Sequence, residues 1–300
     1  MKEVPASEHF AVSFDSPDAG TLLREGKPRP EISVLMPTFN NARFLSYSIP
    51  SILNQSIEDF EFIIIDDGSN DGSGDLLEEY AQKDKRIKLI RNENNMGIVF
   101  SLNRGLQNCQ GEYIVRMDAD DISLRDRLQK QIEVMQADPG IAVLGAALSY
   151  IDASGNELGM IRRCTVNKSL IMQNPLLHPT VVIRKSYLKS HGLGYLEKYR
   201  FAEDYFLWLQ LSRVGRLAAI DDIVLKYRLS NQATRVRNLK SVLLATLKVK
   251  KNAVFTLGIK PSLPDVLKFL AEGLLLLMPG SLILWVYLKK TFRKGIKGRI

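Results

Sequence analysis

Cysteine and histidine are scarce in this chain, and their scarcity excludes several kinds of site. The 300 residues contain two cysteines, Cys109 and Cys164, and three histidines. Two distant cysteines give neither a disulfide framework nor the ligand spacing of a zinc site, and they suit a reducing compartment. Residues 1–30 also lack an apolar core of roughly 7–15 residues, so we expect no signal peptide.

Glycine-rich phosphate-binding motifs are missing as well. The sequence has no G-x-x-x-x-G-K-[ST], and no G-x-G-x-x-G follows a predicted strand. Their absence excludes P-loop nucleotidases and dinucleotide-binding folds. A nucleotidyltransferase would need a glycine-rich phosphate loop with a basic residue near the first strand, where this chain has Pro37-Thr38-Phe39-Asn40.

Acidic residues are rare toward the C-terminus, although the chain as a whole carries a net charge of +8. Residues 224–300 contain 16 Lys and Arg against 2 Asp and Glu. Such a segment favours a polyanionic partner. The segment is too apolar for nucleic acid and carries no nucleic-acid module, so we expect an anionic membrane surface and no nucleic acid.

The remaining pattern predicts an α/β protein. Apolar runs of strand type alternate with amphipathic segments of helical spacing, which is typical of βαβ units in a doubly wound, mostly parallel Rossmann-type sheet flanked by helices. We predict a flexible arm over residues 1–30, a catalytic domain over 31–236 and a helical C-terminal extension over 237–300. The expected strands are 32–36, 60–65, 87–90, 113–115, 141–145 and 181–183.

Polar and acidic residues follow three of these strands. The first strand is followed by Pro37-Thr38-Phe39-Asn40, the second by Asp66-Asp67-Gly68-Ser69, and the fourth by Asp118-Ala119-Asp120-Asp121. Parallel strands bind ligands at the edge where their carboxyl ends meet, so the three ends should form one pocket. Carboxylates this close repel one another unless a cation lies among them. Oxygen ligands suit Mg²⁺ or Mn²⁺ bound with substrate phosphates.

Five motifs in this order resemble the inverting glycosyltransferases of family 2, which have the GT-A fold. They are P-T-F-N, F-I-I-I-D-D-G-S-N-D-G-S, N-N-M-G-I-V-F-S-L-N-R-G, G-E-Y-I-V-R-M-D-A-D-D and F-A-E-D-Y-F-L-W, within residues 31–230. The resemblance implies a GT-A-like fold and a nucleotide-sugar donor. It implies that Asp120 binds the divalent metal. The donor nucleotide would contact Pro37, Thr38, Phe39, Asp66, Asp67, Gly97, Asn103 and Asp118.

The pair Glu203-Asp204 is a second acidic group downstream. An Asp at this place could simply be an N-cap of the following helix. In the family the Asp of this pair is the general base, so the resemblance implies that Asp204 removes the proton from the acceptor hydroxyl. Such catalysis contributes on the order of 10²–10⁴-fold to the rate. Glu203 beside it is a candidate acceptor contact.

Three further residues are candidates for acceptor or phosphate contacts. His178 precedes a predicted strand and resembles an acceptor-side segment of the family, although a lone histidine is more often structural. Arg228 and Arg235 resemble the closing basic segment, where guanidinium groups suit phosphates; a solvated basic loop is the alternative. After Arg235 the chain has Val236 in place of the Trp of processive synthases, which favours transfer of a single sugar.

The C-terminal extension is both apolar and basic. Phe269–Leu288 is an apolar run of 20 residues, but Glu272 and Pro279-Gly280 interrupt it. Two short helices lying in the membrane interface, followed by six basic residues from Lys289 to Arg299, fit this pattern best. A single span, a re-entrant hairpin or a buried oligomer contact are the alternatives.

The sequence therefore predicts a cytoplasmic glycosyltransferase attached peripherally to the membrane. It would move one sugar from a UDP- or dTDP-sugar to a glycan or a lipid-linked acceptor, assisted by Mg²⁺ or Mn²⁺. A catalytically silent protein that binds a sugar nucleotide, or a scaffold of a glycan-assembly complex, is the second hypothesis. It would keep the nucleotide pocket without needing Asp204.

Overall fold

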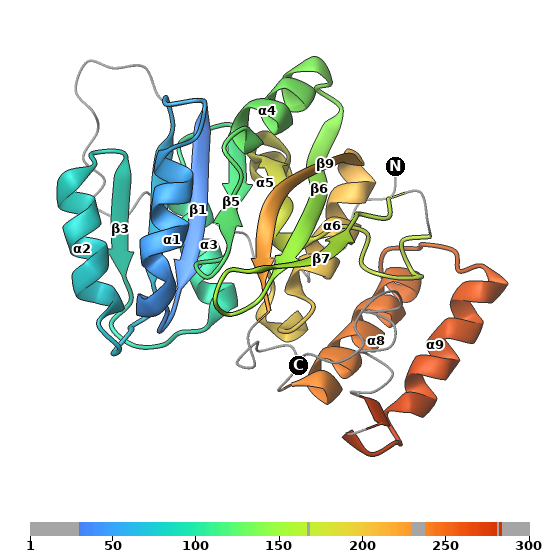
Figure 1. Ribbon diagram of the computed structural model, residues 1–300. Helices are drawn as coiled ribbons and strands as arrows, with labels where there is room; N and C mark the ends of the chain where they lie inside the picture. Colours follow the sequence, from blue (N-terminus) through green and yellow to red (C-terminus); the bar gives the residue numbers. More distant parts are fainter. Residues whose placement is uncertain (1–29, 167–168, 230–237, 281, 284–300) are drawn as a thin grey trace.

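A nine-stranded mixed sheet covered by helices on both faces forms the body of the protein (Figure 1). The structure is a computed structural model that describes residues 30–166, 169–229, 238–280 and 282–283. Four strands near one end are parallel, in the order β3-β2-β1-β4, and confirm the predicted βαβ units. Their bounds are β1 Ile32–Thr38, β2 Glu61–Asp66, β3 Ile87–Arg91 and β4 Tyr113–Arg116.

The other half of the sheet is mixed. β8 is antiparallel to both β4 and β6, whereas β6 and β9 run parallel, and β5 and β7 pair antiparallel at the periphery. Sequence reasoning missed β5, β7 and the whole of β9. The bounds are β5 Ile122–Ser123, β6 Ile141–Ile151, β7 Glu157–Arg162, β8 Val182–Arg184 and β9 Arg216–Arg228.

Two apolar clusters, one on each face, hold the helices on the sheet. Alternate residues of β1 point to opposite faces, so Val34 and Met36 join one cluster and Leu35 the other. The first cluster packs α1 Ala42–Leu53, α2 Ser73–Lys83 and α4 Arg127–Ala137. The second packs α3 Ile98–Asn108, α5 Lys185–His191 and α6 Glu203–Val214. Short 3-10 turns, η2 His178–Thr180 and η3 Glu197–Tyr199, precede β8 and α6.

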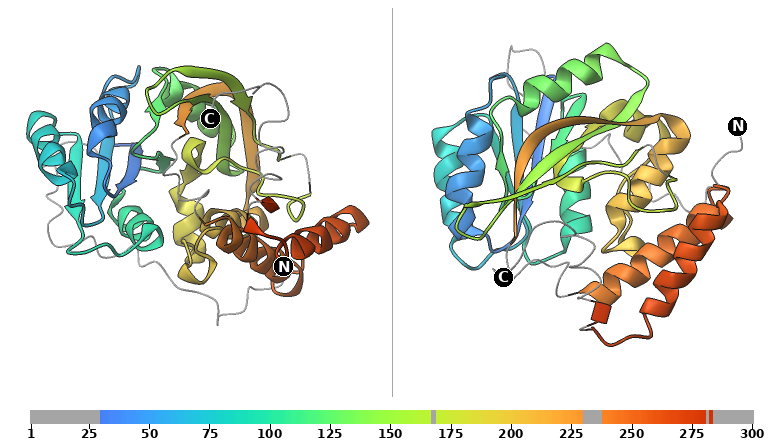
Figure 2. Two further views of the ribbon diagram at one scale, coloured as in Figure 1. Left: turned by 60° about the horizontal axis from the view of Figure 1, so that its bottom comes forward. Right: turned by 45° about the vertical axis from the view of Figure 1, so that its right-hand side comes forward.

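Helices α8 Leu239–Phe255 and α9 Leu263–Leu275 lie side by side at one end of the molecule (Figures 1 and 2). Both lie within the C-terminal extension that the sequence predicts to be helical. α8 contributes Val249 and Ala253 to a third apolar cluster with Tyr205 and Phe206 of α6. α8 is thus packed on the body of the protein. The predicted boundary at residue 236 and the basic residues after 288 lie outside the described residues.

Helix α9 has an unusual orientation, because its polar residues face inward. Asp265 is 1% exposed, and its carboxylate accepts hydrogen bonds from Ser262 and Ser169. Glu272 pairs with the buried Lys250 of α8 at 2.6 Å. The outer side of α9 carries exposed leucines and one valine: Leu263, Val266, Leu267, Leu270 and Leu274. In the described part of the chain, no helix combines the length and apolarity that crossing a bilayer requires.

Candidate active site

The strand ends meet at one edge of the sheet, as the parallel pairing requires. Thr38 at the end of β1 is in register with Asp66 at the end of β2, and Arg116 ends β4 on the other side of β1. Pro37 and Thr38 are buried within β1, whereas the ring of Phe39 is 41% exposed just beyond it. The acidic loop after β4 therefore lies next to the polar residues that follow β1 and β2.

Asp67 organises the loop that leads into α3. One carboxylate oxygen accepts hydrogen bonds from the Asn92 amide at 2.6 Å and the Met96 N–H at 2.9 Å, and the other accepts the Gly97 N–H at 2.9 Å. Gly97 has φ of 89°, a left-handed conformation that favours glycine. The described contacts of Asp67 therefore fix this loop and leave room for about one further hydrogen bond to the carboxylate.

Asp66 and Asn103 also make defined contacts. Asp66 accepts the Ser69 N–H at 3.1 Å and faces the Arg91 guanidinium at 3.7 Å. The amide of Asn103 donates to the Tyr195 carbonyl at 2.8 Å and accepts the Tyr195 N–H at 2.9 Å, which ties α3 to the chain before η3. Contacts of Asp66 and Asn103 with a donor stay predictions.

The acidic loop is built around a buried arginine that sequence reasoning did not single out. Arg116 is 4% exposed and pairs with Asp118 at 2.5 Å, while two of its guanidinium nitrogens, Nε and Nη1, have no hydrogen-bond partner among the described residues. Its position, as a charged residue directly after the apolar Tyr113-Ile114-Val115, was the available signal. Arg116 offsets part of the negative charge of the loop from within the sheet.

Asp121 is fully buried and Asp120 is half-buried, and the negative charge of these two carboxylates is not fully offset by nearby cations. Burial, followed by the charge of Asp118, raises the pKa of Asp120 to about 6. Burial and the charge of Asp120 also raise the pKa of Asp121. One oxygen of Asp121 accepts the Arg228 N–H at 2.9 Å, and the other has no hydrogen-bond partner in the described part of the chain.

This donor set fits a hard divalent cation. Buried carboxylates that repel one another, with one buried oxygen left without a partner, are stabilised by a cation. No three His, Cys, Asp or Glu side chains converge as a complete metal site within the described residues. Mg²⁺ is commonly held by one or two carboxylates together with substrate phosphates, so Asp120 and its neighbours can supply the protein's share of the ligands.

Arg228 at the end of β9 holds the acidic loop in place. Its side chain is buried and donates to the backbone carbonyls of Asp120 at 2.8 Å and of Asp152 and Ala153 at 3.1 Å. Its guanidinium also lies over the Phe44 ring, 4.7 Å from the ring centre. These contacts give Arg228 a positioning role. A phosphate contact for Arg228 stays a prediction, and Arg235 lies outside the described residues.

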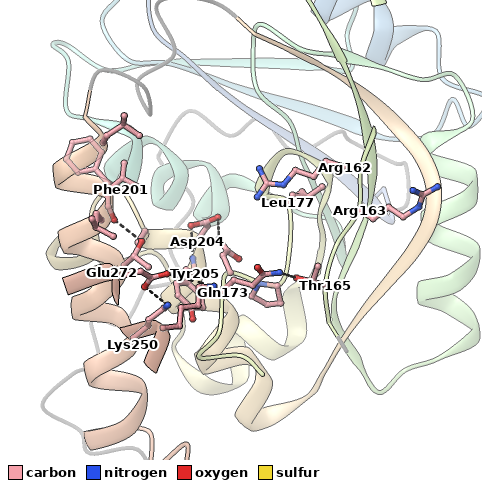
Figure 3. Close-up of a pocket in the computed structure, with 18 of the residues that line it drawn as sticks. Arg162, Arg163, Thr165, Gln173, Leu177, Phe201, Asp204, Tyr205, Lys250 and Glu272 are labelled. Atoms are coloured by element: carbon pink, nitrogen blue, oxygen red, sulfur yellow. Dashed lines mark hydrogen bonds and ion pairs between the residues drawn. The ribbon is translucent and has the colours of Figure 1, made fainter. Parts of the chain in front are cut away.

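Asp204 stands at the start of α6 on the wall of a large cavity (Figure 3). Ala202 is the N-cap of this helix, so the alternative that Asp204 is the N-cap is wrong. One oxygen of Asp204 accepts the Tyr205 N–H at 2.7 Å, and the other accepts the amide of Asn174 at 2.8 Å. Asn174, a contact that sequence reasoning missed, orients this carboxylate toward the cavity side of the helix.

Glu203 lies on the buried side of the same turn. Burial, followed by the charge of Asp204, raises the pKa of Glu203 to about 7. One carboxylate oxygen is buried without a hydrogen-bond partner among the described residues. Two adjacent carboxyl groups, one of them with a buried oxygen that has no partner, therefore make this turn electrostatically unfavourable.

Tyr195 connects the two acidic groups. Burial raises its pKa, and although Arg116 opposes the shift, Asp204, Glu203 and Asp118 add to it. All three carboxylates thus lie near one phenol. The Tyr195 hydroxyl is 2.9 Å from Nε2 of His178, whose ring packs edge-on against Trp208. These contacts support the structural role for His178, and an acceptor contact stays a prediction.

Comparison with known proteins settles the class. The model of the family described as glycosyl transferase family 2 matches residues 33–188. The chain belongs to glycosyl transferase family 2. An uncharacterised glycosyltransferase of Haemophilus influenzae is 34% identical over 70% of this chain and 69% of its own. The amylovoran biosynthesis glycosyltransferase AmsE of Erwinia amylovora is 30% identical over 88% of this chain and 99% of its own.

Solved structures of low identity show the same fold. TarS of S. aureus, residues 1–349 in complex with UDP, superposes with a TM-score of 0.61 at 19% identity, over 88% of this chain and 72% of that one. The mannosyltransferase PcManGT of Pyrobaculum calidifontis, in complex with GDP-Man and Mn²⁺, superposes with a TM-score of 0.60 at 17% identity. The superposition covers 90% of this chain and 89% of that one. The predicted GT-A-like α/β fold of this family 2 glycosyltransferase is therefore confirmed.

Proposed function

We propose that this family 2 enzyme is an inverting transferase that moves one sugar from a UDP- or dTDP-sugar to a hydroxyl of a glycan or lipid-linked acceptor. The observation that carries the proposal is the position of Asp204, which faces a cavity large enough for an acceptor. Asp204 and Asp118 of the acidic loop both lie close enough to Tyr195 to influence its pKa. The UDP bound to the structural neighbour TarS, and the amylovoran biosynthesis role in the name of AmsE, support a nucleotide-sugar donor and a role in polysaccharide assembly.

In this mechanism Asp204 acts as the general base. Its carboxylate takes the proton of the acceptor hydroxyl while that oxygen attacks the anomeric carbon, and the bond to the nucleoside diphosphate breaks on the opposite face. Attack from the opposite face inverts the anomeric configuration. Asn174 keeps the carboxylate oriented by its 2.8 Å hydrogen bond. A base within hydrogen-bond reach accounts for roughly 10²–10⁴-fold of the rate.

The acidic loop and the loop after β2 bind the donor. Asp67, with its remaining lone pair, accepts the N3–H of the uracil or thymine ring, and Asp118 contacts the ribose or the sugar. Asp120 would hold Mg²⁺ or Mn²⁺, and the bound ion would supply positive charge to offset the charge of the leaving diphosphate. Arg228 binds the backbone of Asp120 and Arg116 pairs with Asp118. These contacts hold the acidic loop in position when the donor is absent.

The exposed face of α9 attaches the enzyme to an anionic membrane surface on the cytoplasmic side. Five apolar residues of this helix are at least 40% exposed, Leu263, Val266, Leu267, Leu270 and Leu274, and the sequence after residue 288 is rich in Lys and Arg. Apolar insertion and roughly 1 kcal/mol per basic residue near anionic lipid add together. The protein should float with anionic vesicles, and high salt should reduce the fraction that floats. If neutral vesicles carry the same fraction of the protein, the contribution of charge is contradicted.

A thermal-shift panel of nucleotides and nucleotide sugars, each with and without Mn²⁺, tests the proposal. The reason is that a ligand bound only to the folded state raises the midpoint by mass action. We expect UDP- or dTDP-sugars to raise the unfolding temperature, and more so with Mn²⁺. A donor that binds but is never turned over would instead support the catalytically silent binding protein. If no nucleotide stabilises the protein, the proposed donor pocket is wrong.

A further inference from the structure

The cavity beside Asp204 is larger than one sugar requires. Its volume is about 1160 Å³, whereas typical small-molecule pockets measure roughly 300–1,000 Å³. It lies between β7, the segment before η2, α6 and the two C-terminal helices (Figure 3). The space can therefore hold the acceptor sugar together with a substantial part of the group to which that sugar is attached.

Two parts of the wall of this cavity differ in chemistry. Near Asp204 the wall carries the amides of Asn174 and Gln173 and the hydroxyl of Thr165, with Gln173 donating to Thr165 at 2.7 Å. Hydroxyls and amides of this kind bind sugar hydroxyls. Another wall comes from α8 and α9, whose lining residues are mainly aliphatic, together with Ile283 beyond them: Leu239, Val242, Leu243, Ala271, Leu275 and Ile283.

Charged groups on the helical wall are already used by the protein itself. Lys250 of α8 is 1% exposed, pairs with Glu272 at 2.6 Å and donates to the Met172 carbonyl at 3.3 Å. Lys268 of α9 also donates to the Met172 carbonyl and lies 3.8 Å from Glu272. These lysines hold the two helices together and to the 169–175 loop. The surface that this wall offers to a ligand is therefore mainly aliphatic.

The geometry points to an acceptor whose sugar is linked to an apolar chain, with the sugar at Asp204 and the chain against Val242, Leu243 and Leu275. The assignment rests on the proposed function, because it names the acceptor class for that same base. It makes α8 and α9, which lie beyond the residues matched by the family model, the determinants of acceptor choice. The exposed leucines on the outer side of α9 place the apolar wall of the cavity beside the surface proposed to meet the membrane.

Two adjacent pairs of leucines provide matched variants. On α8, Leu243 lines the cavity while Leu244 is 55% exposed on the outside; on α9, Leu275 lines the cavity while Leu274 is 62% exposed. Replacing each by Gln changes polarity at nearly constant length. Leu243→Gln and Leu275→Gln alter the cavity, and Leu244→Gln and Leu274→Gln alter only the outer surface.

The experiment compares octyl β-glucoside with methyl β-glucoside by calorimetry on the full chain, below the micelle concentration of the octyl compound. The two probes differ only in the apolar chain, and each buried methylene strengthens binding roughly fourfold. We expect octyl glucoside to bind at least about fiftyfold more tightly. Leu243→Gln and Leu275→Gln should each reduce this affinity at least about tenfold, and the two outer variants should change it less than about twofold.

Two outcomes overturn the inference: equal affinity for the two glucosides, or loss of octyl binding in the outer variants alone. If one cavity variant does not fold, the other still tests the claim, as does an octyl glucoside with a photoreactive group at its chain end, which should label α8 or α9. Failure of the proposed function is distinguishable, because Asp204→Asn would then retain transfer whether or not octyl glucoside binds.

Discussion

Replacing Arg228 by Lys separates two roles that the sequence left open. The guanidinium makes hydrogen bonds of 2.8, 3.1 and 3.1 Å to three backbone carbonyls and lies over Phe44. A lysine ammonium at this place can reach about one of these carbonyls. Hydrogen bonds to charged groups contribute roughly 1.5–3 kcal/mol each, so the variant should lose about 3 kcal/mol of unfolding free energy.

The expected readout is a lower unfolding temperature in the absence of any donor. For a chain of 300 residues, about 3 kcal/mol corresponds to a fall of roughly 5 °C in the unfolding temperature. Donor affinity should fall as well, because the backbone of Asp120 is no longer held. The matched control is Arg163→Lys, which changes an exposed arginine with one ion pair to Asp221 at 3.3 Å; exposed pairs contribute less than about 1 kcal/mol. An Arg228→Lys variant with unchanged stability and weakened donor binding would refute the positioning role and favour a phosphate contact.

Three other perturbations test the electrostatics. Glu203 has a pKa of about 7 in the folded protein against 4.5 ordinarily, so the native state binds its proton more tightly and stability falls as pH rises between these values. Glu203→Gln should remove up to about 3 kcal/mol of this pH dependence in denaturant titrations at pH 4.5 and 8; a pH-independent difference would contradict the buried charge. Lys250→Met should cost up to about 3–5 kcal/mol, because Glu272 then keeps only Lys268, 3.8 Å away, as a cationic partner, and adding Glu272→Leu should restore most of this loss; no recovery in the double variant would show that the pair is not the cause. Treatment with EDTA should abolish transfer and added Mn²⁺ should restore it; transfer that EDTA leaves unchanged would rule out the metal at Asp120.

The parallel half of the sheet was predictable from the sequence. Buried strands such as Phe60–Ile65 are continuous apolar runs, and the turn residues that follow them are distinctive. The strand β9 was not predictable by the same means. Its segment Arg216–Arg228 has acidic residues Asp221 and Asp222 in the middle and is half-exposed, so it shows no clear apolar period. Its strand conformation comes from pairing with β6.

The acidic residues of the site could be predicted from the sequence, but the residues that hold them in place could not. The spacing and order of the motifs pointed to Asp118, Asp120 and Asp204, whose chemistry is visible in the residue types. The groups that hold them depend on contacts between distant segments. Asn174 reaches Asp204 across 30 positions, and Arg228 reaches the Asp120 backbone across 108. No local pattern reports such pairs.

The helix α9 shows a further limit of pattern reading. The sequence placed Asp265, Lys268 and Glu272 on one narrow face, and a polar face ordinarily meets water. In the structure this face turns inward, because Lys250 of α8 and the Met172 carbonyl supply partners for it. The leucines are therefore exposed, which no analysis of α9 alone could establish.

The most direct test of the account is Asp204→Asn, measured for both transfer and donor binding. The variant keeps the size of the side chain and removes the base, so we expect transfer to fall by roughly 10²–10⁴-fold. Donor affinity in the presence of Mn²⁺ should stay within about twofold of the native value, because Asp204 contacts the acceptor side. Transfer at the native rate, or loss of donor binding together with transfer, would contradict the assignment of Asp204 as the general base.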